Sequence, residues 1–350
     1  MAGKARVSLR DVGRVAGVSH VTVSLALRNH PDVSPTTRKR IQELAASLGY
    51  RPDPMLRALA EYRRTKEKAR HQGVLAWLNY YEDPTVLATT YEFALFRKGA
   101  EMRANELGYK LAEFTPTADK IEAARLKRIL ATRGIQGLLL PPQPHAHTLM
   151  DFDFSGFAAV AFGYTIQAPR FHVISNFQSR SSLIAYRKLR EYGFKRVGFV
   201  IFNSLNERTD GAFLGGFLRD QAQLPEAQKV PFLIPEDAAS ARPEKKFRRW
   251  YEEHHPDAII TGRDHLPQLF EECRKMRVRI PDDLSVALLT VGPPSDGLAG
   301  IDQNALETGR VAVETLVGML YRNQLGVPEI PLNILIEGTW RDGASVRCPA

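Results

Sequence analysis

The sequence predicts a small all-α segment at the N-terminus, followed by a larger α/β body with parallel sheets. Apolar residues recur at helical spacing in residues 8–62, whereas from about residue 72 short apolar runs alternate with amphipathic helical patterns. The charge divides the chain at the same place. Residues 1–72 hold 15 Lys and Arg against 6 Asp and Glu, and residues 73–350 hold 33 of each sign. The whole net charge of +9 therefore lies in the first fifth of the chain, which suggests that this segment meets a polyanion.

The N-terminal segment carries the start and stop signals of three helices. A serine stands before each helix, where its side chain can cap the first turn, and a proline follows the third serine at the first helical position. Gly17 separates the first two helices, and Gly49 ends the third. The expected helices follow Ser8, Ser19 and Ser34 and cover residues 9–16, 20–28 and 35–48.

Two short helices joined by a tight Gly-containing turn, with a third as support, predict a helix-turn-helix whose second helix enters the major groove of DNA. Val23 and Leu27 share the buried face of that helix by their i, i+4 spacing. Short polar side chains around it suit phosphate contacts. The alternative is a small helical protein-interaction module. The residues that we predict to contact DNA here are Ser19, His20, Val21, Thr22, Ser24, Leu25, Arg28, Asn29 and Ser34.

Three ordered patterns run through this segment: D-V-x-x-x-A-G-V-S-x-x-T-V-S, then V-S-x-x-T-R-x-x-I, then L-G-Y-x-P. With them, residues 8–62 resemble the headpiece of the lactose/galactose repressor family of bacterial transcription regulators. The resemblance implies a hinge helix that forms on operator DNA and pushes a leucine into the minor groove. Asp53-Pro54 begins that segment here, and Leu59 matches the leucine, with plain packing between domains as the alternative. Residues 53–62 are too short to form a stable helix alone, so the hinge can respond to DNA and to the body.

The headpiece departs from the family pattern at positions that face DNA. Leu25 stands where the family often has Arg, Arg28 where it often has Asn, and Asp53 where it usually has Asn. Leu25 and Val21 can contact a thymine methyl group but cannot form a bidentate bond to guanine. His20 and Arg28 are then the best candidates for polar contacts. We therefore expect an operator sequence unlike those of better-known members.

The remainder of the chain reads as repeated βαβ units, which predict parallel sheets with helices on both faces. About 220 residues of such units exceed one comfortable sheet, so two lobes are expected. The predicted strands cover residues 73–81, 110–114, 137–140, 158–164, 196–202, 257–262 and 284–291. The predicted helices cover residues 93–107, 120–133, 180–192, 265–277 and 306–323.

The body is also similar to the lactose/galactose repressor family, through YRKLREYGFKRVGFV, PDAIITGRD, IPDDLSVALLTV and ETGRVAVETLVGML in family order. The resemblance implies a periplasmic-binding-protein-like fold of two lobes around a ligand cleft, with the chain crossing between lobes near residues 166, 297 and 329. The expected domains are a helix-turn-helix domain (1–52), a hinge helix and linker (53–71) and an effector-binding and dimerisation body (72–350). Its N-lobe would comprise residues 72–166 and 298–329, and its C-lobe residues 167–297 and 330–350.

Ligands of parallel α/β lobes bind outside the carboxyl ends of the strands, which locates a candidate pocket. Aromatic, amide, carboxylate and guanidinium groups gather there and suit a small polar ring such as a sugar. The family often has an Arg three residues before a Gly-aromatic pair; Phe213 occupies that position here, so Arg208 is the candidate substitute. Each candidate has the alternative of a structural hydrogen bond. The predicted effector-binding residues are Asn79, Tyr80, Phe162, Arg208, Phe213, Asp264 and Gln303.

Other classes of protein find little support. Two cysteines, Cys273 and Cys348, exclude a disulfide framework, and no stretch approaches the ~20 apolar residues that span a bilayer. The N-terminus lacks the apolar region of a secretory signal, so a cytoplasmic protein is expected. The histidine pairs 145/147 and 254/255 are poorly spaced for metal, and neither a metal nor a cofactor is expected.

The sequence therefore predicts a sequence-specific transcription regulator, usually a repressor, that binds a near-palindromic operator as a homodimer. A small-molecule, sugar-like effector would control it from the cleft between the lobes. The competing hypothesis is a sugar-binding or sugar-processing protein on the same body fold. Such a protein would lack the basic head, and an enzyme would need a catalytic group in the cleft, for which the sequence offers no convincing motif.

Overall fold

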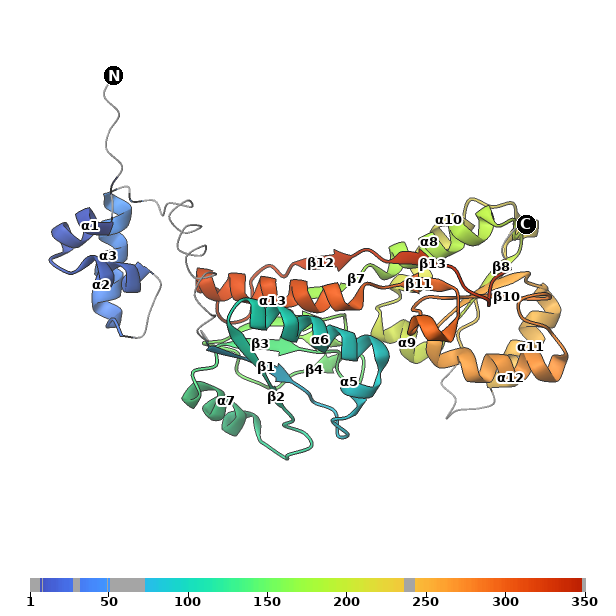
Figure 1. The fold of residues 1–350 in the computed structure, drawn as a ribbon, viewed down its shortest axis with the longest axis horizontal. Helices are drawn as coiled ribbons and strands as arrows, with labels where there is room; N and C mark the ends of the chain where they lie inside the picture. Colours follow the sequence, from blue (N-terminus) through green and yellow to red (C-terminus); the bar gives the residue numbers. More distant parts are fainter. Residues whose placement is uncertain are drawn as a thin grey trace, which may run out of the picture.

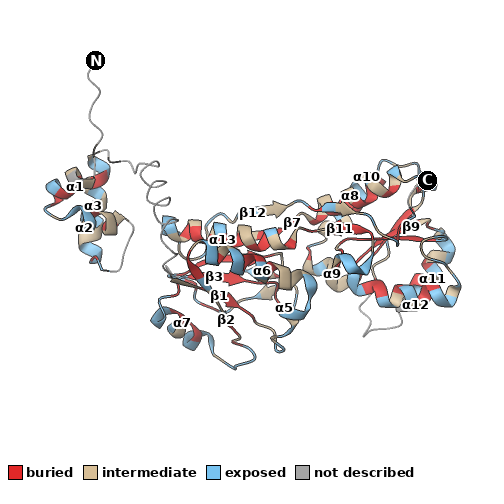
Figure 2. Ribbon diagram, in the orientation of Figure 1, coloured by how far each residue is buried: buried red, intermediate tan, exposed pale blue. Residues whose placement is uncertain are grey.

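A computed structural model of the chain describes residues 7, 9–27, 32–48, 50, 73–235 and 243–347. In Figure 1 the small N-terminal helices lie at one end of the long axis, and two α/β lobes follow along it. Figure 2 shows that buried residues concentrate in the strands and on the sheet-facing sides of the helices. None of the described helices is long and apolar enough to cross a membrane.

The headpiece forms the three predicted helices, α1 (Leu9–Ala16), α2 (His20–Leu27) and α3 (Pro35–Ser47). Its core is made of small and branched apolar side chains from all three helices and the turn before α3. Small residues are needed because helices this short must pack closely together to bury their apolar side chains. The buried set is Val12, Ala16, Val23, Ala26, Val33, Ile41 and Ala45.

The first lobe is built on a six-stranded sheet in the order β12-β7-β5-β3-β1-β2, in which every neighbouring pair is parallel. Helices α6 (Tyr91–Glu106) and α13 (Ala305–Arg322) cover one face, and α7 (Ala123–Thr132) covers the other. A short helix, α5 (Val86–Thr89), precedes α6. The strands are β1 (Gly73–Leu78), β2 (Tyr109–Phe114), β3 (Gly137–Leu140), β5 (Ala158–Phe162), β7 (His172–Asn176) and β12 (Asn333–Ile336). A separate small pair joins β4 (Thr148–Leu149) and β6 (Ile166–Ala168).

The second lobe is built on a five-stranded sheet in the order β13-β11-β10-β9-β8, parallel except for β13. Helices α8 (Gln178–Glu191) and α10 (Ala212–Gln221) pack on one face, and α11 (Pro243–His254) and α12 (Leu266–Met276) on the other. Helix α9 (Asn203–Arg208) follows the first strand of this sheet. The strands are β8 (Val197–Val200), β9 (Ala258–Thr261), β10 (Ser285–Leu288), β11 (Gly300–Asp302) and β13 (Thr339–Arg341).

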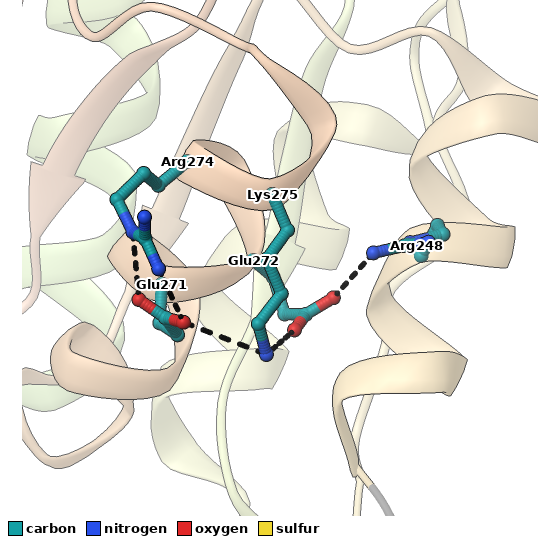
Figure 3. A network of polar contacts seen from close by, with 5 residues as sticks. All are labelled: Arg248, Glu271, Glu272, Arg274 and Lys275. Atoms are coloured by element: carbon teal, nitrogen blue, oxygen red, sulfur yellow. Dashed lines mark hydrogen bonds and ion pairs between the residues drawn. The ribbon is translucent and has the colours of Figure 1, made fainter.

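Helices α11 and α12 are joined by an ion-pair network as well as by apolar packing (Figure 3). The Glu272 carboxylate, which is buried, lies 2.8 Å from Lys275 Nζ on its own helix and 3.3 Å from Arg248 Nη2 on α11. Glu271 extends the network to Arg274, at 2.9 Å. Because a buried carboxylate needs partners, this arrangement fixes the register of the two helices.

The chain changes lobes later than the sequence predicted. The last strand of the first lobe before the change, β7, ends at Asn176, so the expected crossing near 166 is wrong. β11 still belongs to the second sheet and β12 to the first, which moves the other crossings from 297 and 329 to about 303 and 337. The physical reason is that β7, β11 and β12 are short and only partly apolar, so they carry no strong strand pattern.

Helices α6 and α13 touch through their backbones. A Cβ added at Gly99 would lie 1.9 Å from the Leu306 carbonyl oxygen, and one added at Gly309 would lie 2.0 Å from the Phe96 carbonyl oxygen. Only glycine fits at both positions. The two helices therefore form one closely packed pair over the first sheet.

Candidate DNA-binding surface and effector cavity

The turn between α1 and α2 has the local geometry that a helix-turn-helix needs. Gly17 adopts a positive φ of 68°, which a residue with a side chain rarely adopts. Ser19 then starts α2, because its Oγ accepts a hydrogen bond of 3.0 Å from the Thr22 backbone N–H. The predicted cap at Ser34 is also present, since its Oγ accepts from the Thr37 N–H at 3.3 Å.

Helix α3 holds the first two helices by their C-terminal ends. Arg40 Nη2 donates to the Ala16 carbonyl at 3.2 Å, and Gln42 Nε2 donates to the Ala26 carbonyl at 3.1 Å. Helix ends leave carbonyl groups without intrahelical partners, so these side chains supply missing hydrogen bonds and fix where α1 and α2 end. The orientation of α2 is therefore set by α3.

The predicted contact residues of α2 differ in how far their side chains are exposed. His20 and Val21 are exposed, Val21 at 53%, while Thr22 and Ser24 are half-buried. Leu25 is half-buried too and packs partly against the headpiece core, and its assignment as a DNA contact stays a prediction. Val23 is buried as expected. Ala26, rather than Leu27, is the fully buried residue beside Val23, and Leu27 is half-buried. The small side chain of Ala26 lets α3 approach α2 more closely.

The remaining predicted DNA contacts lie outside the described residues. Arg28, Asn29, Asp53 and Leu59 all belong to segments that the structure does not describe, as does the whole predicted hinge of residues 53–71. Their assignments stay predictions.

A cavity of about 110 Å³ lies between the two lobes. It is lined by residues at or just beyond the carboxyl ends of β3, β5, β7 and β10, in agreement with the rule for parallel α/β sheets. Helices α6, α9 and α10 complete the wall. The lining residues of the first lobe and its edge are Glu92, Phe93, Phe96, Pro142, Phe162, Gly163, Tyr164, Thr165, Ser175, Asn176 and Gln178, and those of the second are Leu205, Arg208, Thr209, Phe213 and Thr290.

Arg208 joins the two lobes at the cavity. It is the last residue of α9 in the second lobe, and its Nη1 donates to the carbonyls of Gln143 at 2.7 Å and Pro144 at 2.8 Å in the first lobe. Its Nη2 lies 3.3 Å from the hydroxyl of Tyr81, also in the first lobe. Three oxygen atoms of the opposite lobe therefore surround one guanidinium group.

Glu92 is a cavity residue that the sequence reasoning missed. It lies in the first turn of α6 and accepts a hydrogen bond of 3.3 Å from Asn176 Nδ2. Burial raises the pKa of the Glu92 carboxyl to about 7, and the nearby charge of Arg208 offsets part of that rise. One sequence signal could have found it: Glu92 starts the helix that follows the first strand, at the edge where ligands gather.

Comparison with known proteins agrees with both parts of this architecture. Residues 8–53 match the family model for bacterial regulatory proteins of the lacI family, and residues 186–346 match the model for a periplasmic binding protein-like domain. The HTH-type transcriptional repressor PurR of Haemophilus influenzae (strain PittGG) is 24% identical over 344 residues, which cover 92% of this chain and 94% of that protein.

The chain carries a lacI-family helix-turn-helix domain and a periplasmic binding protein-like domain.

The similarity to known regulators is highest in the headpiece. Catabolite control protein A of Priestia megaterium is 44% identical over 59 residues, 17% of this chain and 18% of that protein. Solved structures show the same fold over the whole chain. A CelR–cellobiose complex has a TM-score of 0.57 at 19% identity and covers 97% of this chain and 100% of that one. A lac repressor dimer bound to operator and an anti-inducer has a TM-score of 0.55 at 17% identity, covering 97% and 99%.

Three of the seven predicted effector-binding residues line the cavity: Phe162, Arg208 and Phe213. Asn79 and Tyr80 do not line it. Asn79 is fully buried, and its amide donates to the Pro84 carbonyl and to Glu113, both at 2.9 Å. Tyr80 packs in the core beneath α7, where burial raises the pKa of its hydroxyl to about 12.

Asp264 and Gln303 also do not line the cavity. Asp264 is exposed in a short 3-10 turn, Arg263–His265, of the second lobe. Gln303 is buried where the chain changes lobes; it accepts from Ser181 Oγ at 3.0 Å and donates to the Leu289 carbonyl. No group of three His, Cys, Asp or Glu that could hold a metal occurs among the described residues.

Proposed function

We propose that this LacI-family regulator is a repressor that binds a near-palindromic operator as a homodimer and acts by binding rather than by catalysis. The observation that carries the proposal is the exposed His20–Val21 end of α2, held on the scaffold of α1 and α3. Its N-terminal residues are those that a recognition helix presents to base edges. A two-fold protein matches two half-sites, and a basic head meets the phosphates.

The proposed contacts to DNA are divided by the chemistry of each side chain. His20 and Arg28 reach bases or phosphates, and Val21 contacts a thymine methyl group. Ser19, Thr22, Ser24, Asn29 and Ser34 contact phosphates and position the headpiece. Leu59 enters the minor groove as a wedge.

A small molecule in the interlobe cavity controls this binding in the cytoplasm. Arg208 supports that role, because it lines the cavity and its bonds cross to the other lobe, so a ligand that moves it changes lobe closure. Closure would alter the separation of the hinge segments in the dimer. Such coupling between two sites is typically worth about 1–3 kcal/mol.

The test is selection of binding sites from random duplexes with the full chain, followed by affinity measurements across a salt series. We expect an enriched near-palindrome and a log–log salt slope of about −0.9 for each neutralised phosphate. His20→Ala should lower the affinity for the selected site, whereas Glu43→Gln, an exposed change on α3, should not. Equal affinity for every duplex and for heparin contradicts the proposal and favours a sugar-binding or sugar-processing protein.

A further inference from the structure

Most polar groups around the interlobe cavity are already bonded to protein. Gln178 Nε2 donates to Asn176 Oδ1 at 2.8 Å and to Ser175 Oγ at 2.9 Å. Thr165 Oγ1 accepts from the Gln143 backbone N–H at 2.8 Å, and Thr209 Oγ1 donates to the Leu205 carbonyl at 2.8 Å. The Gln178 amide nitrogen and the Thr209 hydroxyl proton are thus already engaged, and the two threonine hydroxyls keep only part of their bonding capacity.

The two charged groups of the cavity, Arg208 and Glu92, differ in how many of their hydrogen-bonding sites the protein already fills. The Arg208 guanidinium is surrounded by three oxygen atoms of the opposite lobe. The Glu92 carboxylate accepts one hydrogen bond, at 3.3 Å, from the described residues. A carboxylate has about four sites for donors, so Glu92 is the charged group of the cavity with the larger capacity for a ligand donor.

Aromatic rings make up much of the remaining wall. The Phe96 ring stacks on Phe162 at 5.4 Å and on Phe93 at 6.1 Å between centroids, and Phe213 and Tyr164 also line the cavity. The volume of about 110 Å³ is on the scale of a single ring, since an apolar cavity of about 150 Å³ holds benzene.

We propose that the effector of this protein is a small molecule with one flat, largely apolar ring and a single amino group that donates to Glu92. This inference rests on the proposed function, in which the cavity is the effector site. A sugar carries hydroxyl groups around its whole ring, and against these phenylalanines several of them would lose their bonds to water without replacement. An ammonium group meets both the carboxylate and the faces of the rings. This proposal differs from the sugar-like effector that the strand-end residues suggested, and the experiment below compares the two.

The experiment compares three molecules with the same ring, benzylamine, benzyl alcohol and benzoate, together with glucose and glucosamine. Ligand-observed NMR titrations on the full chain give a dissociation constant for each. We expect benzylamine to bind at least about tenfold more tightly than the alcohol or benzoate, and the two sugars to bind more weakly than benzylamine. Affinity for benzylamine should fall as the pH drops below 7, because the acceptor is the ionised carboxylate.

Three variants test whether Glu92 causes the preference for the amine. Glu92→Gln should remove the tenfold preference for the amine, Glu92→Asp should retain part of it, and Glu101→Gln, an exposed change on the same helix, should leave it unchanged. Thermal unfolding of each variant checks that it is folded. Saturable sugar binding tighter than that of benzylamine, no binding by any of the three ring compounds, or an amine preference that survives Glu92→Gln would overturn the inference.

The proposed function is measured separately on the same protein. Failure of the amine titration with operator binding intact would refute only the ligand class. Amine binding with no selected operator would refute the repressor proposal and leave the cavity chemistry standing.

Discussion

Arg208 Nη1 lies 2.7 Å from the carbonyl oxygen of Gln143, and this hydrogen bond joins one lobe of the protein to the other. This bond and its neighbour to Pro144 link the lobes directly, so closure of the cleft has support from the chain itself. Hydrogen bonds to charged groups contribute about 1.5–3 kcal/mol each when protected from water. The half-buried position of Arg208 reduces that figure.

Arg208→Ala should therefore open the cleft in the unliganded protein. Small-angle X-ray scattering should record a larger radius of gyration for the variant, and the stability of the body should fall by about 1–2 kcal/mol. Arg208→Lys keeps the charge but offers no planar fork to two carbonyls, so it should be intermediate. A variant with unchanged scattering would show that other contacts hold the lobes.

Glu92 should make the stability of the body depend on pH. The pKa of its carboxyl is raised from 4.5 to about 7 in the folded protein, so the unfolded chain loses the proton first. The stabilising contribution of the protonated form is complete below about pH 4.5 and is lost as the pH rises through 7. Between pH 5 and pH 8, wild type should lose up to about 2 kcal/mol relative to Glu92→Gln, after allowance for water at a half-buried carboxyl. Parallel thermal or denaturant unfolding curves at the two pH values test this, and equal pH dependence of both proteins contradicts it.

Alanine substitutions at two positions of α2, Leu25 and His20, should have different effects on stability and on DNA binding. Leu25 packs against the headpiece core, so Leu25→Ala should destabilise the headpiece by about 1–2 kcal/mol. His20 is exposed, so His20→Ala should leave stability unchanged and weaken binding to a selected operator. Hydrogen exchange of the α2 amides in the full chain separates the two effects. Faster exchange in His20→Ala than in Leu25→Ala would reverse the assignment.

The close contact between α6 and α13 predicts that adding one methyl group at Gly99 strongly lowers the stability of the protein. Gly99→Ala places a Cβ 1.9 Å from a backbone carbonyl that has no space to move, and we expect a loss of about 3 kcal/mol or more. Gly318→Ala is the matched control on α13, because its nearest neighbour is the flexible end of Arg322 at 3.1 Å. Thermal unfolding of the two variants gives the comparison, and similar melting temperatures would contradict the close packing described above.

The sequence predicts those parts of the fold that local patterns encode. The strand at 137–140 has the predicted bounds, and the headpiece helices begin at Leu9, His20 and Pro35 because caps and proline mark their starts. Strand β7 was missed because HVISN mixes polar and apolar residues, and its place in the sheet depends on neighbours far along the chain. Helices α10 and α11 were not assigned bounds. Two adjacent glycines weaken the pattern of α10, whereas the aromatic residues of α11 do have helical spacing and were overlooked.

The cavity was predicted less well than the fold, because strand-end residues are not equivalent. Asn79 and Gln303 stand at the expected edge, but their amides are bonded to Glu113 and Ser181, partners that lie 34 and 122 residues away in the sequence. Only tertiary structure reveals that such side chains are already occupied. Glu92 was missed because it comes from a helix rather than from the end of a strand.

The glycine contact between α6 and α13 also limits how the first lobe can move. At Gly99 and Gly309 the two helix backbones meet with no side chain between them, which resists sliding, so we expect the lobe to turn as a rigid body. Its pivots are the three places where the chain changes sheets. We therefore expect a tilt that begins at the first turn of α6 to reach Gly73 undiminished. Gly73 is the residue at which the body meets the segment leading to the headpiece. A deformable helix pair would absorb the same tilt before it reached the DNA.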